Sequence, residues 1–143
     1  MTILPIYLCD SGAEFEGLNI WGSPWSKTFE GMNPHCKAFT VDTEEELAEK
    51  FARIPHDIDI LITHSPPYGI LDNTIEDENV GSGSLSIALI NRPRIIMHIF
   101  GHIHESYGKT GPKRLNCGWR TFVNASHVNE NYEPVNKPIR VIL

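Results

Sequence analysis

The sequence predicts an α/β domain in which helices pack on a sheet of mixed strand pairing. Two short runs, residues 58–63 and 94–100, are almost continuously apolar, which is typical of strands buried on both faces of a sheet. A segment with helix character precedes each run, and further short apolar runs lie near both ends of the chain. This order of strands, helix, strand, helix and strands indicates a layered α/β architecture rather than a simple doubly wound repeat.

The composition is that of one ordinary globular domain. The chain has 143 residues, of which 41% are hydrophobic and 21% are charged, and no linker-like segment divides it, so residues 1–143 are treated as a single unit. The net charge is −6 with neutral histidines, which argues against a basic face that binds a nucleic-acid duplex. No apolar stretch approaches the length of a membrane span, so no membrane partner is expected.

Strands are predicted at the start of the chain. Residues 3–9 and 18–21 are short apolar runs, and together they predict a β-hairpin. The Asp-Ser-Gly sequence at residues 10–12 separates them and is interpreted as the turn. Residues 37–41 predict one more strand.

Two helices are predicted in the middle of the chain. The first lies within residues 41–55, where Asp42 or Thr43 can cap the N-terminus. Its apolar side chains recur at spacings of four and three residues and form one face, made of Leu47, Phe51 and Ile54. The second lies within residues 84–93, is mostly apolar, and ends at Pro93. Such a helix needs other elements to cover it.

The remaining segments are strands and the loops that follow them. Residues 58–63 lead directly into a rigid loop at 64–69, and residues 71–83 predict a long loop. Residues 119–126 and 138–143 predict two closing strands.

Three histidines follow the two buried strands. His64 comes directly after residues 58–63, and His102 and His104 come directly after residues 94–100. A crossover helix between two strands makes them parallel, and the carboxyl ends of parallel neighbours meet at one edge of a sheet. If the chain stays extended, the two later histidines also share a side. Because imidazole is a good ligand for Zn, Mn and Fe, this edge is predicted to be a metal site.

The alternative is that these histidines bind no metal and instead lie at the surface or form hydrogen bonds in the core. For the other histidines of the chain, this alternative is preferred. His98 lies inside a predicted strand and is expected to pack there. His127 lies in a polar loop after a strand and is a candidate pocket residue.

Further candidates for the pocket come from the end of the chain. Asn124 and Ser126 follow the strand predicted next to the one that carries the histidine pair, so their side chains can face the pocket. The alternative is turn chemistry after a strand. Tyr107 can stack on a flat ligand or simply pack against the protein.

The cysteine pattern bears on the cellular compartment. Cys9, Cys36 and Cys117 are an odd number and have no metal-binding spacing. They predict reduced thiols in a cytoplasmic protein. The N-terminus has no basic region and no small-residue cleavage site, so no signal peptide is expected.

The chain contains the segments ILITHSPP, HIFGHIHESYG and TFVNAS. Together they resemble the motifs of the calcineurin-like metallophosphoesterase superfamily. The segments IWGSPW, LITHSPPYGILD and NYEPVNKPI are similar to the metallophosphoesterase-domain-containing branch, which resembles class III cyclic-nucleotide phosphodiesterases. The resemblance runs from about residue 6 to the C-terminus.

The resemblance implies both a fold and a ligand set. The fold implied is the C-terminal half of a four-layer α-β-β-α sandwich. The implied metal ligands are His64 and His102 for one ion and His104 for the other. The family's other motifs, DxH, GDxxD and GNH, have no counterpart: no Asp is followed two positions later by His, and no Gly-Asp or Gly-Asn pair occurs. No catalytic histidine is therefore identified, and the N-terminal, motif-bearing half of the domain is expected to be missing.

These observations predict a metal-dependent phosphoesterase chain that is weak or inactive alone. It is expected to bind at most one divalent ion, Mn, Fe or Zn, and to act on a phosphoester or nucleotide. A homodimer or a complementing N-terminal segment is the expected macromolecular partner, since half a sandwich leaves strand edges and apolar surface uncovered. The alternative is a non-catalytic relative that binds nucleotides or proteins.

Overall fold

The computed structural model describes residues 5–29, 31–32, 34–35, 37–115 and 118–143. Cys36 and Cys117 lie outside the described residues, so the thiol prediction can be followed only at Cys9, which is free. No helix in the described part of the chain is long and apolar enough to cross a membrane.

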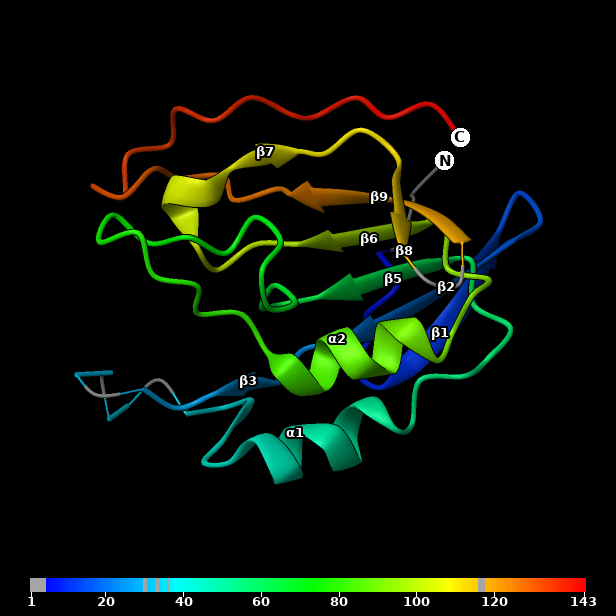
Figure 1. Ribbon diagram of the computed structural model, residues 1–143, viewed down its shortest axis with the longest axis horizontal. Coiled ribbons are helices and arrows are strands. Elements are labelled where there is room, and N and C mark those ends of the chain that lie inside the picture. The colour runs from blue at the N-terminus through cyan, green and yellow to red at the C-terminus, as the bar shows by residue number, and fades with distance from the viewer. Residues whose placement is uncertain (1–4, 30, 33, 36, 116–117) are drawn as a thin grey trace.

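Within the described residues, seven strands form one mixed sheet, in the order β1-β2-β5-β6-β9-β7, with β8 paired to β9 (Figure 1). The central strands β2, β5, β6 and β9 run parallel, and β1, β7 and β8 are antiparallel to their neighbours. The strands span Ser11–Phe15 (β1), Leu18–Ser23 (β2), Ile60–Thr63 (β5), Met97–Phe100 (β6), Gly108–Lys109 (β7), Lys113–Leu115 (β8) and Gly118–Asn124 (β9). A separate parallel pair joins Ser26–Lys27 (β3) to Thr40–Val41 (β4).

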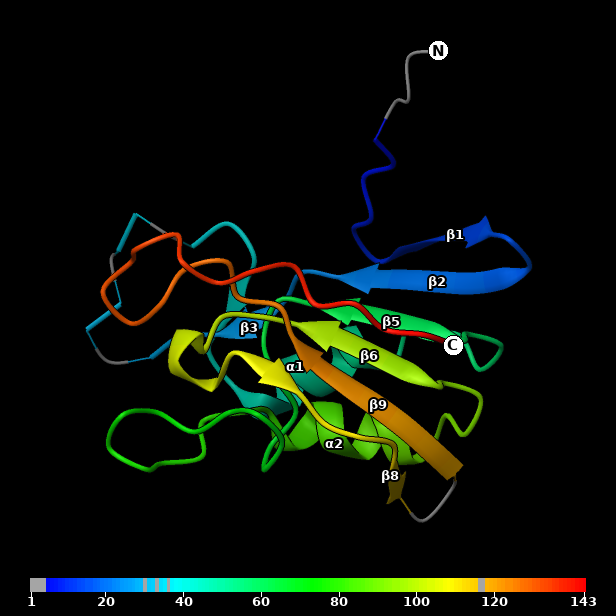
Figure 2. The ribbon, with the colours of Figure 1, turned by 90° about the horizontal axis from the view of Figure 1, so that it is seen from above.

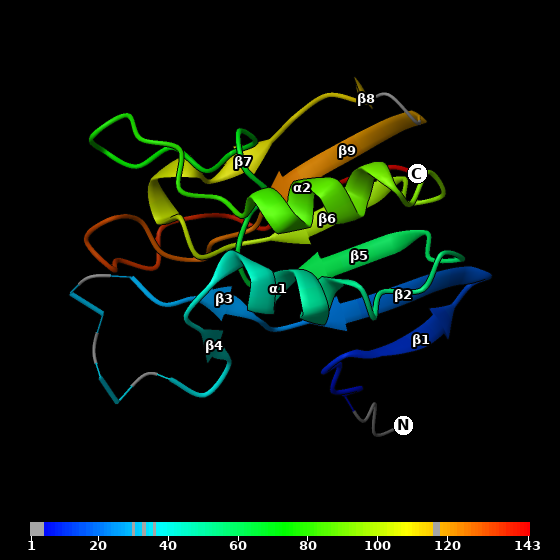
Figure 3. The same ribbon diagram turned by 60° about the horizontal axis from the view of Figure 1, so that its bottom comes forward.

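Two helices, α1 (Glu44–Phe51) and α2 (Gly83–Ile90), lie side by side on one face of the sheet (Figure 3). The core between the layers is apolar and buried: Leu47, Phe51, Ile54, Leu61, Leu85, Leu89, Phe100 and Phe122. The predicted apolar face of α1 is therefore confirmed. One helix layer on one mixed sheet is what half of a four-layer sandwich contributes, so the predicted fold class is confirmed as well.

The N-terminal ends of the helices are fixed to each other. Thr43 and Glu46 form a reciprocal capping box, so Thr43 is the N-cap of α1. The Glu44 carboxylate then accepts hydrogen bonds from the Ser82 hydroxyl, the N-cap of α2, and from the Ser84 backbone N–H, both at 3.0 Å. Burial raises the pKa of Glu44, but the hydrogen bonds from Ser84 and Ser82 and the charge of Lys27 outweigh this, so the pKa lies below its usual value.

The C-terminal ends of the helices are held by two buried arginines. Arg92 donates to main-chain carbonyls at the end of α1 and in α2, those of Ala52, Ile54 and Ala88. Arg120 of β9 donates to the carbonyls of Leu89, Arg92 and Ile95. These carbonyls include groups that have no partner within their own helix, and the positive charges lie where the helix dipole favours them.

No helix among the described residues covers the opposite face of the sheet, which also carries apolar side chains. Leu61 points into the core, so its neighbour Ile62 points to the other face, where it lies between Gly22 and Ile99. Ile62 is 37% exposed. The C-terminal residues run alongside β7 (Figure 1), where Lys109 Nζ donates to the Arg140 carbonyl. Seen from above, both helices lie on one side of the sheet (Figure 2).

Two strand predictions are wrong. Residues 5–9 are not a strand; β1 begins at Ser11, and the hairpin turn falls at Glu16 and Gly17, whose φ values are 51° and 81°. A two-residue turn with both φ values positive matches the twist of a hairpin, so this turn, not Asp-Ser-Gly, sets the register. Residues 138–143 pair with no strand among the described residues, and side chains of β7 and its neighbourhood hold the tail instead.

The other predicted elements are present with shorter bounds. Residues 58–63 and 94–100 contain β5 and β6, which are parallel neighbours as expected. Helix α2 begins at Gly83, one residue before the predicted segment 84–93, and ends at Ile90, before Pro93. The long loop at 71–83 holds turns and isolated bridges up to the start of α2.

His98 of β6 packs in the core, as predicted, and is fully buried. Its ring lies 4.9 Å from that of Phe100 and 6.0 Å from that of Phe122. Burial, with the nearby charge of Arg120, lowers the pKa of His98 from 6.5 to about 3.

This depressed pKa predicts loss of stability in acid. Below pH 6.5 the unfolded chain protonates this histidine while the folded chain does not, so the unfolded state binds more protons. Stability is therefore complete above pH 6.5 and falls as the pH drops toward 3, by up to about 1.4 kcal/mol per pH unit. Urea unfolding of the wild type and of His98→Leu at pH 7 and pH 5 measures this. The variant is expected to lose about 2 kcal/mol less over that interval; parallel losses would contradict the assignment.

Candidate metal centre

The ends of β5 and β6 bring two of the predicted histidines together. Ile62 pairs with Ile99 one residue before each strand ends, and the Gly101 N–H donates to the His64 carbonyl at 3.0 Å. The rings of His64 and His102 lie with their centroids 4.6 Å apart and their planes tilted by 50°. The predicted meeting of these two side chains at one sheet edge is therefore seen in the geometry.

The loop after β6 does not stay extended, which corrects the assumption that His102 and His104 share a side of an extended chain. His102 has a φ of 72°, in the left-handed region, and His104 begins a short 3₁₀ helix, His104–Ser106. A non-glycine residue at such a φ is uncommon and often marks a functional constraint. The ring of His104 packs edge-on against Tyr132, with centroids 5.1 Å apart.

The electrostatics of the pair favour neutral imidazoles. Burial, followed by the charges of His64 and His104, lowers the pKa of His102 to about 4, against an opposing effect of Glu105. Burial, followed by the charge of His104, also lowers the pKa of His64. Unprotonated nitrogens at neutral pH are the form of histidine that binds a metal ion.

The residues present fit a metal ion only in part. The chemistry of the His64–His102 pair suits Zn, Mn or Fe. However, the described part of the chain contains no group of three or more His, Cys, Asp or Glu side chains that could hold a metal ion. The predicted third ligand, His104, thus does not complete a ligand set with the other two in this geometry.

A cleft of about 950 Å³ opens beside the histidines. His102 and His104 line it together with exposed aromatic residues, namely Phe29, Tyr68 and Tyr132. Leu47 and Phe51 form part of its floor, so the cleft reaches the core of the helix layer. His64 borders a smaller cavity of about 300 Å³ near Pro24 and Thr40. The His64–His102 pair therefore lies between the cleft and the smaller cavity.

Asp72 shapes the loop that borders the cleft. Its carboxylate is fully buried and accepts hydrogen bonds from the N–H groups of Gly69 and Gly81, at 3.0 and 2.8 Å, and from the Asn79 amide at 2.7 Å. One side chain thus closes both ends of the loop. Sequence reasoning missed this role, although an Asp in a glycine-containing loop is a signal for such a turn.

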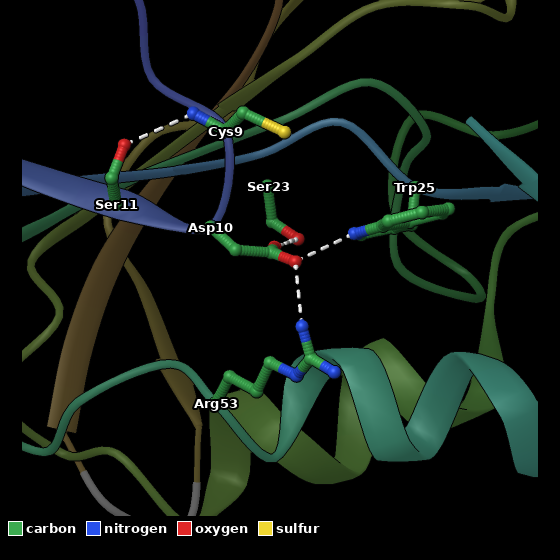
Figure 4. A network of polar contacts seen from close by, with 6 residues as sticks. All are labelled: Cys9, Asp10, Ser11, Ser23, Trp25 and Arg53. Atoms are coloured by element: carbon green, nitrogen blue, oxygen red, sulfur yellow. Dashed lines mark hydrogen bonds and ion pairs between the residues drawn. The ribbon is translucent and has the colours of Figure 1, made fainter. Parts of the chain in front are cut away.

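Asp10 positions another wall of the cleft. It has a φ of 47°, and its carboxylate accepts hydrogen bonds from the Ser23 hydroxyl at 2.9 Å and the Trp25 indole N–H at 2.8 Å (Figure 4). Arg53 of the segment after α1 pairs with the same carboxylate at 3.5 Å. Lys50 Nζ lies 3.9 Å from the centroid of the Trp25 ring. The Asp-Ser-Gly segment therefore holds the aromatic wall and is not the hairpin turn.

The predicted pocket residues do not line the cleft. Asn124 is fully buried, and its amide donates to the carbonyls of Leu71 and Ile103 while its oxygen accepts from Ser126 N–H and Oγ. The Tyr107 hydroxyl donates to the Lys137 carbonyl. His127 is exposed. Asn124 and Ser126 thus join the loops around the site, as the turn-chemistry alternative proposed.

Tyr132 takes the place at the cleft that was predicted for these residues. It is 77% exposed and has a φ of 61°. Its loop is fixed by Asn129, whose side-chain oxygen accepts from the N–H groups of Asn131 and Glu133. Sequence reasoning missed Tyr132 because its contact with His104 joins two distant loops.

The fold and the paired histidines together define a phosphoesterase-type α/β domain. The calcineurin-like phosphoesterase family matches residues 3–106, and this chain belongs to that family. Metallophosphoesterase domain-containing protein 1 of Homo sapiens is 41% identical over 139 residues, which are 96% of this chain and 40% of the human protein. UPF0046 protein T07D4.2 of Caenorhabditis elegans is 34% identical over 134 residues, which are 94% of this chain and 31% of that protein. UPF0046 protein K07C11.7 of the same organism is 35% identical over 133 residues, covering 93% of this chain and 41% of that protein. The chain thus spans less than half the length of these relatives.

Proposed function

We propose that this chain supplies part of a metal-dependent phosphoesterase site, in which His64 and His102 bind a divalent ion, Mn, Fe or Zn. The observation that carries the proposal is the pair of imidazole rings, with centroids 4.6 Å apart, at the carboxyl edge of the sheet. Membership of the calcineurin-like phosphoesterase family supports it. His104, one residue further on, is proposed as a ligand once the site is complete.

The remaining ligands are proposed to come from a segment outside this chain. Two neutral imidazoles cannot offset the charge of two closely spaced cations, so the chain alone is expected to hold at most one ion. The exposed side chain of Ile62, on the sheet face away from the helices, supports a partner that covers this part of the sheet, either an N-terminal segment or a second copy of the chain.

The proposed substrate is a phosphoester or nucleotide whose organic group lies in the cleft. The aromatic side chains of Phe29, Tyr68 and Tyr132 support this, because exposed rings beside a cleft offer faces for a flat ligand. A cytoplasmic location remains a prediction from the cysteine pattern.

A second candidate is a non-catalytic protein that binds nucleotides or other proteins. It is favoured by the incomplete ligand set of the described residues. In that case the cleft would still bind phosphoesters, without turnover under any metal ion.

Complementation separates the two candidates. The chain is incubated with Mn²⁺ and bis(4-nitrophenyl) phosphate, with and without the part of the human relative that lies outside the matched region. We expect hydrolysis only in the mixture, and its loss with a chelator. A mixture made with His102→Ala is expected to be inactive. His56→Ala is the matched control, because His56 is exposed and outside the cleft.

Activity of the His102→Ala mixture equal to that of the wild type would refute the role of the pair. Absence of turnover with Mn²⁺, Fe²⁺ and Zn²⁺, in a mixture that still binds the ester, would favour the non-catalytic candidate.

A further inference from the structure

Two consecutive hydrogen bonds connect the core histidine of β6 to the turn that carries His64. The Thr63 hydroxyl donates to the Ser65 carbonyl at 2.7 Å, and the same oxygen lies 2.9 Å from His98 Nε2. Thr63 is 6% exposed and His98 is fully buried. The connection therefore runs through the interior, away from competing solvent.

The direction of these bonds follows from the number of protons. A threonine hydroxyl has one proton, and here it points to the Ser65 carbonyl, which can only accept. The Thr63 oxygen must then accept from His98, so Nε2 carries the imidazole proton and Nδ1 carries none. Consistently, Nδ1 is buried and has no hydrogen-bond partner within the described residues.

The position of the His98 ring is fixed by packing against aromatic side chains. It is enclosed between the rings of Phe100 and Phe122, with centroids 4.9 and 6.0 Å away. A buried nitrogen without a partner costs stability, on the order of 1–3 kcal/mol. An apolar side chain would avoid that cost, so packing alone does not explain a histidine here.

Hydrogen bonds to the backbone around His64 restrict the conformation of this residue. The Ser65 carbonyl is held by Thr63 on one side of His64, and the His64 carbonyl itself accepts from the Gly101 N–H at 3.0 Å. The second bond reaches the residue next to His102. The backbone on both sides of the His64 ring is therefore tied, once to the core of β6 and once to the loop after it.

We propose that His98, acting through Thr63, is a positioning residue that holds the turn at residues 63–65 so that the His64 ring faces His102. The relevance of this arrangement to metal binding rests on the function proposed above. The geometric statement does not, since it concerns two imidazole rings and their backbone.

The first measurement uses the unmodified chain. Long-range ¹H–¹⁵N correlation spectra at pH 7 report which ring nitrogen of His98 is protonated. We expect a proton on Nε2. A proton on Nδ1 would overturn the proposal, because Thr63 could then not both donate to Ser65 and accept from His98.

The second measurement compares Thr63→Val, which keeps the shape but has no hydroxyl, with Thr63→Ser, which keeps the hydroxyl. In the wild type, the ring protons of His64 and His102 should show a nuclear Overhauser effect (NOE), since the ring centroids lie 4.6 Å apart. We expect this NOE to be lost in Thr63→Val and restored in Thr63→Ser. A general loss of packing would instead alter signals throughout the sheet, and an unchanged NOE in a folded Thr63→Val chain would overturn the proposal.

Zn²⁺ binding links the result to the proposed site. The dissociation constant for Zn²⁺ is expected to rise roughly tenfold in Thr63→Val and to stay near the wild-type value in Thr63→Ser. A wild-type chain that binds no Zn²⁺ would count against the proposed metal role of the pair, while the proton assignment and the ring NOE would still decide whether His98 positions His64.

Discussion

Replacement of Arg120 by methionine is expected to lower the free energy of unfolding by about 4 kcal/mol. The side chain is 2% exposed and donates to three main-chain carbonyls at the end of α2 and before β6. Methionine fills much of the volume but donates to none of them, so buried carbonyls lose their partners. Urea unfolding monitored by circular dichroism measures the change.

The control is Arg94→Met. Arg94 is more than half exposed and forms one ion pair with Asp59 at 2.9 Å. Solvent screens such a pair, so its loss should lower the free energy of unfolding far less than the loss of the buried Arg120 hydrogen bonds. Equal losses in the two variants would show that the buried hydrogen bonds of Arg120 do not anchor the helix layer.

Asn124→Ala is expected to lower the free energy of unfolding by about 3 kcal/mol and to loosen the loops around the histidines. The amide is fully buried, and both of its ends are satisfied by groups from the segments near residues 71, 103 and 126. Alanine leaves these groups unpaired and removes the tie between the loop that Asp72 closes and the loop of His102 and His104.

Hydrogen exchange at the backbone of residues 71–81 and 101–106 should therefore accelerate more than exchange in α1. Asn131→Ala is the control, since Asn131 is exposed in the neighbouring loop. An Asn124→Ala chain with wild-type exchange in both loops would refute the linking role of this amide.

Much of the sheet could be predicted because strands that are buried on both faces have continuously apolar sequences. Continuous apolar runs located β5 and β6, and the helix between them implied parallel neighbours, so the approach of His64 to His102 followed from strand order. The predicted first hairpin is wrong because the apolar residues 5–9 are not a strand and the turn lies later in the chain. Glu16 and Gly17 form a tighter turn than residues 10–12, and polar Ser11 belongs to the strand.

The details of the site could not be predicted for a different reason. The positive φ of His102 and the contact between His104 and Tyr132 depend on loops that are distant in the sequence. A short histidine motif after a strand does not predict the backbone conformation of each histidine, and this conformation sets the direction in which the ring points. The sequence around Asn124 does not distinguish a buried amide from an amide that lines a pocket, because only the hydrogen bonds of the side chain differ between the two.

Different interactions hold the two ends of the helix layer, so acid affects one end more than the other. One end depends on the Glu44 carboxylate, whose depressed pKa means that its contribution is complete above the ordinary pKa of a glutamate and disappears as the pH falls through the lower, folded value. The other end depends on Arg92 and Arg120, which keep their charge in acid. Glu44 and Ser82 border the cleft. Acid therefore weakens the contact between the helices at the end that borders the cleft, while the arginine end keeps its hydrogen bonds.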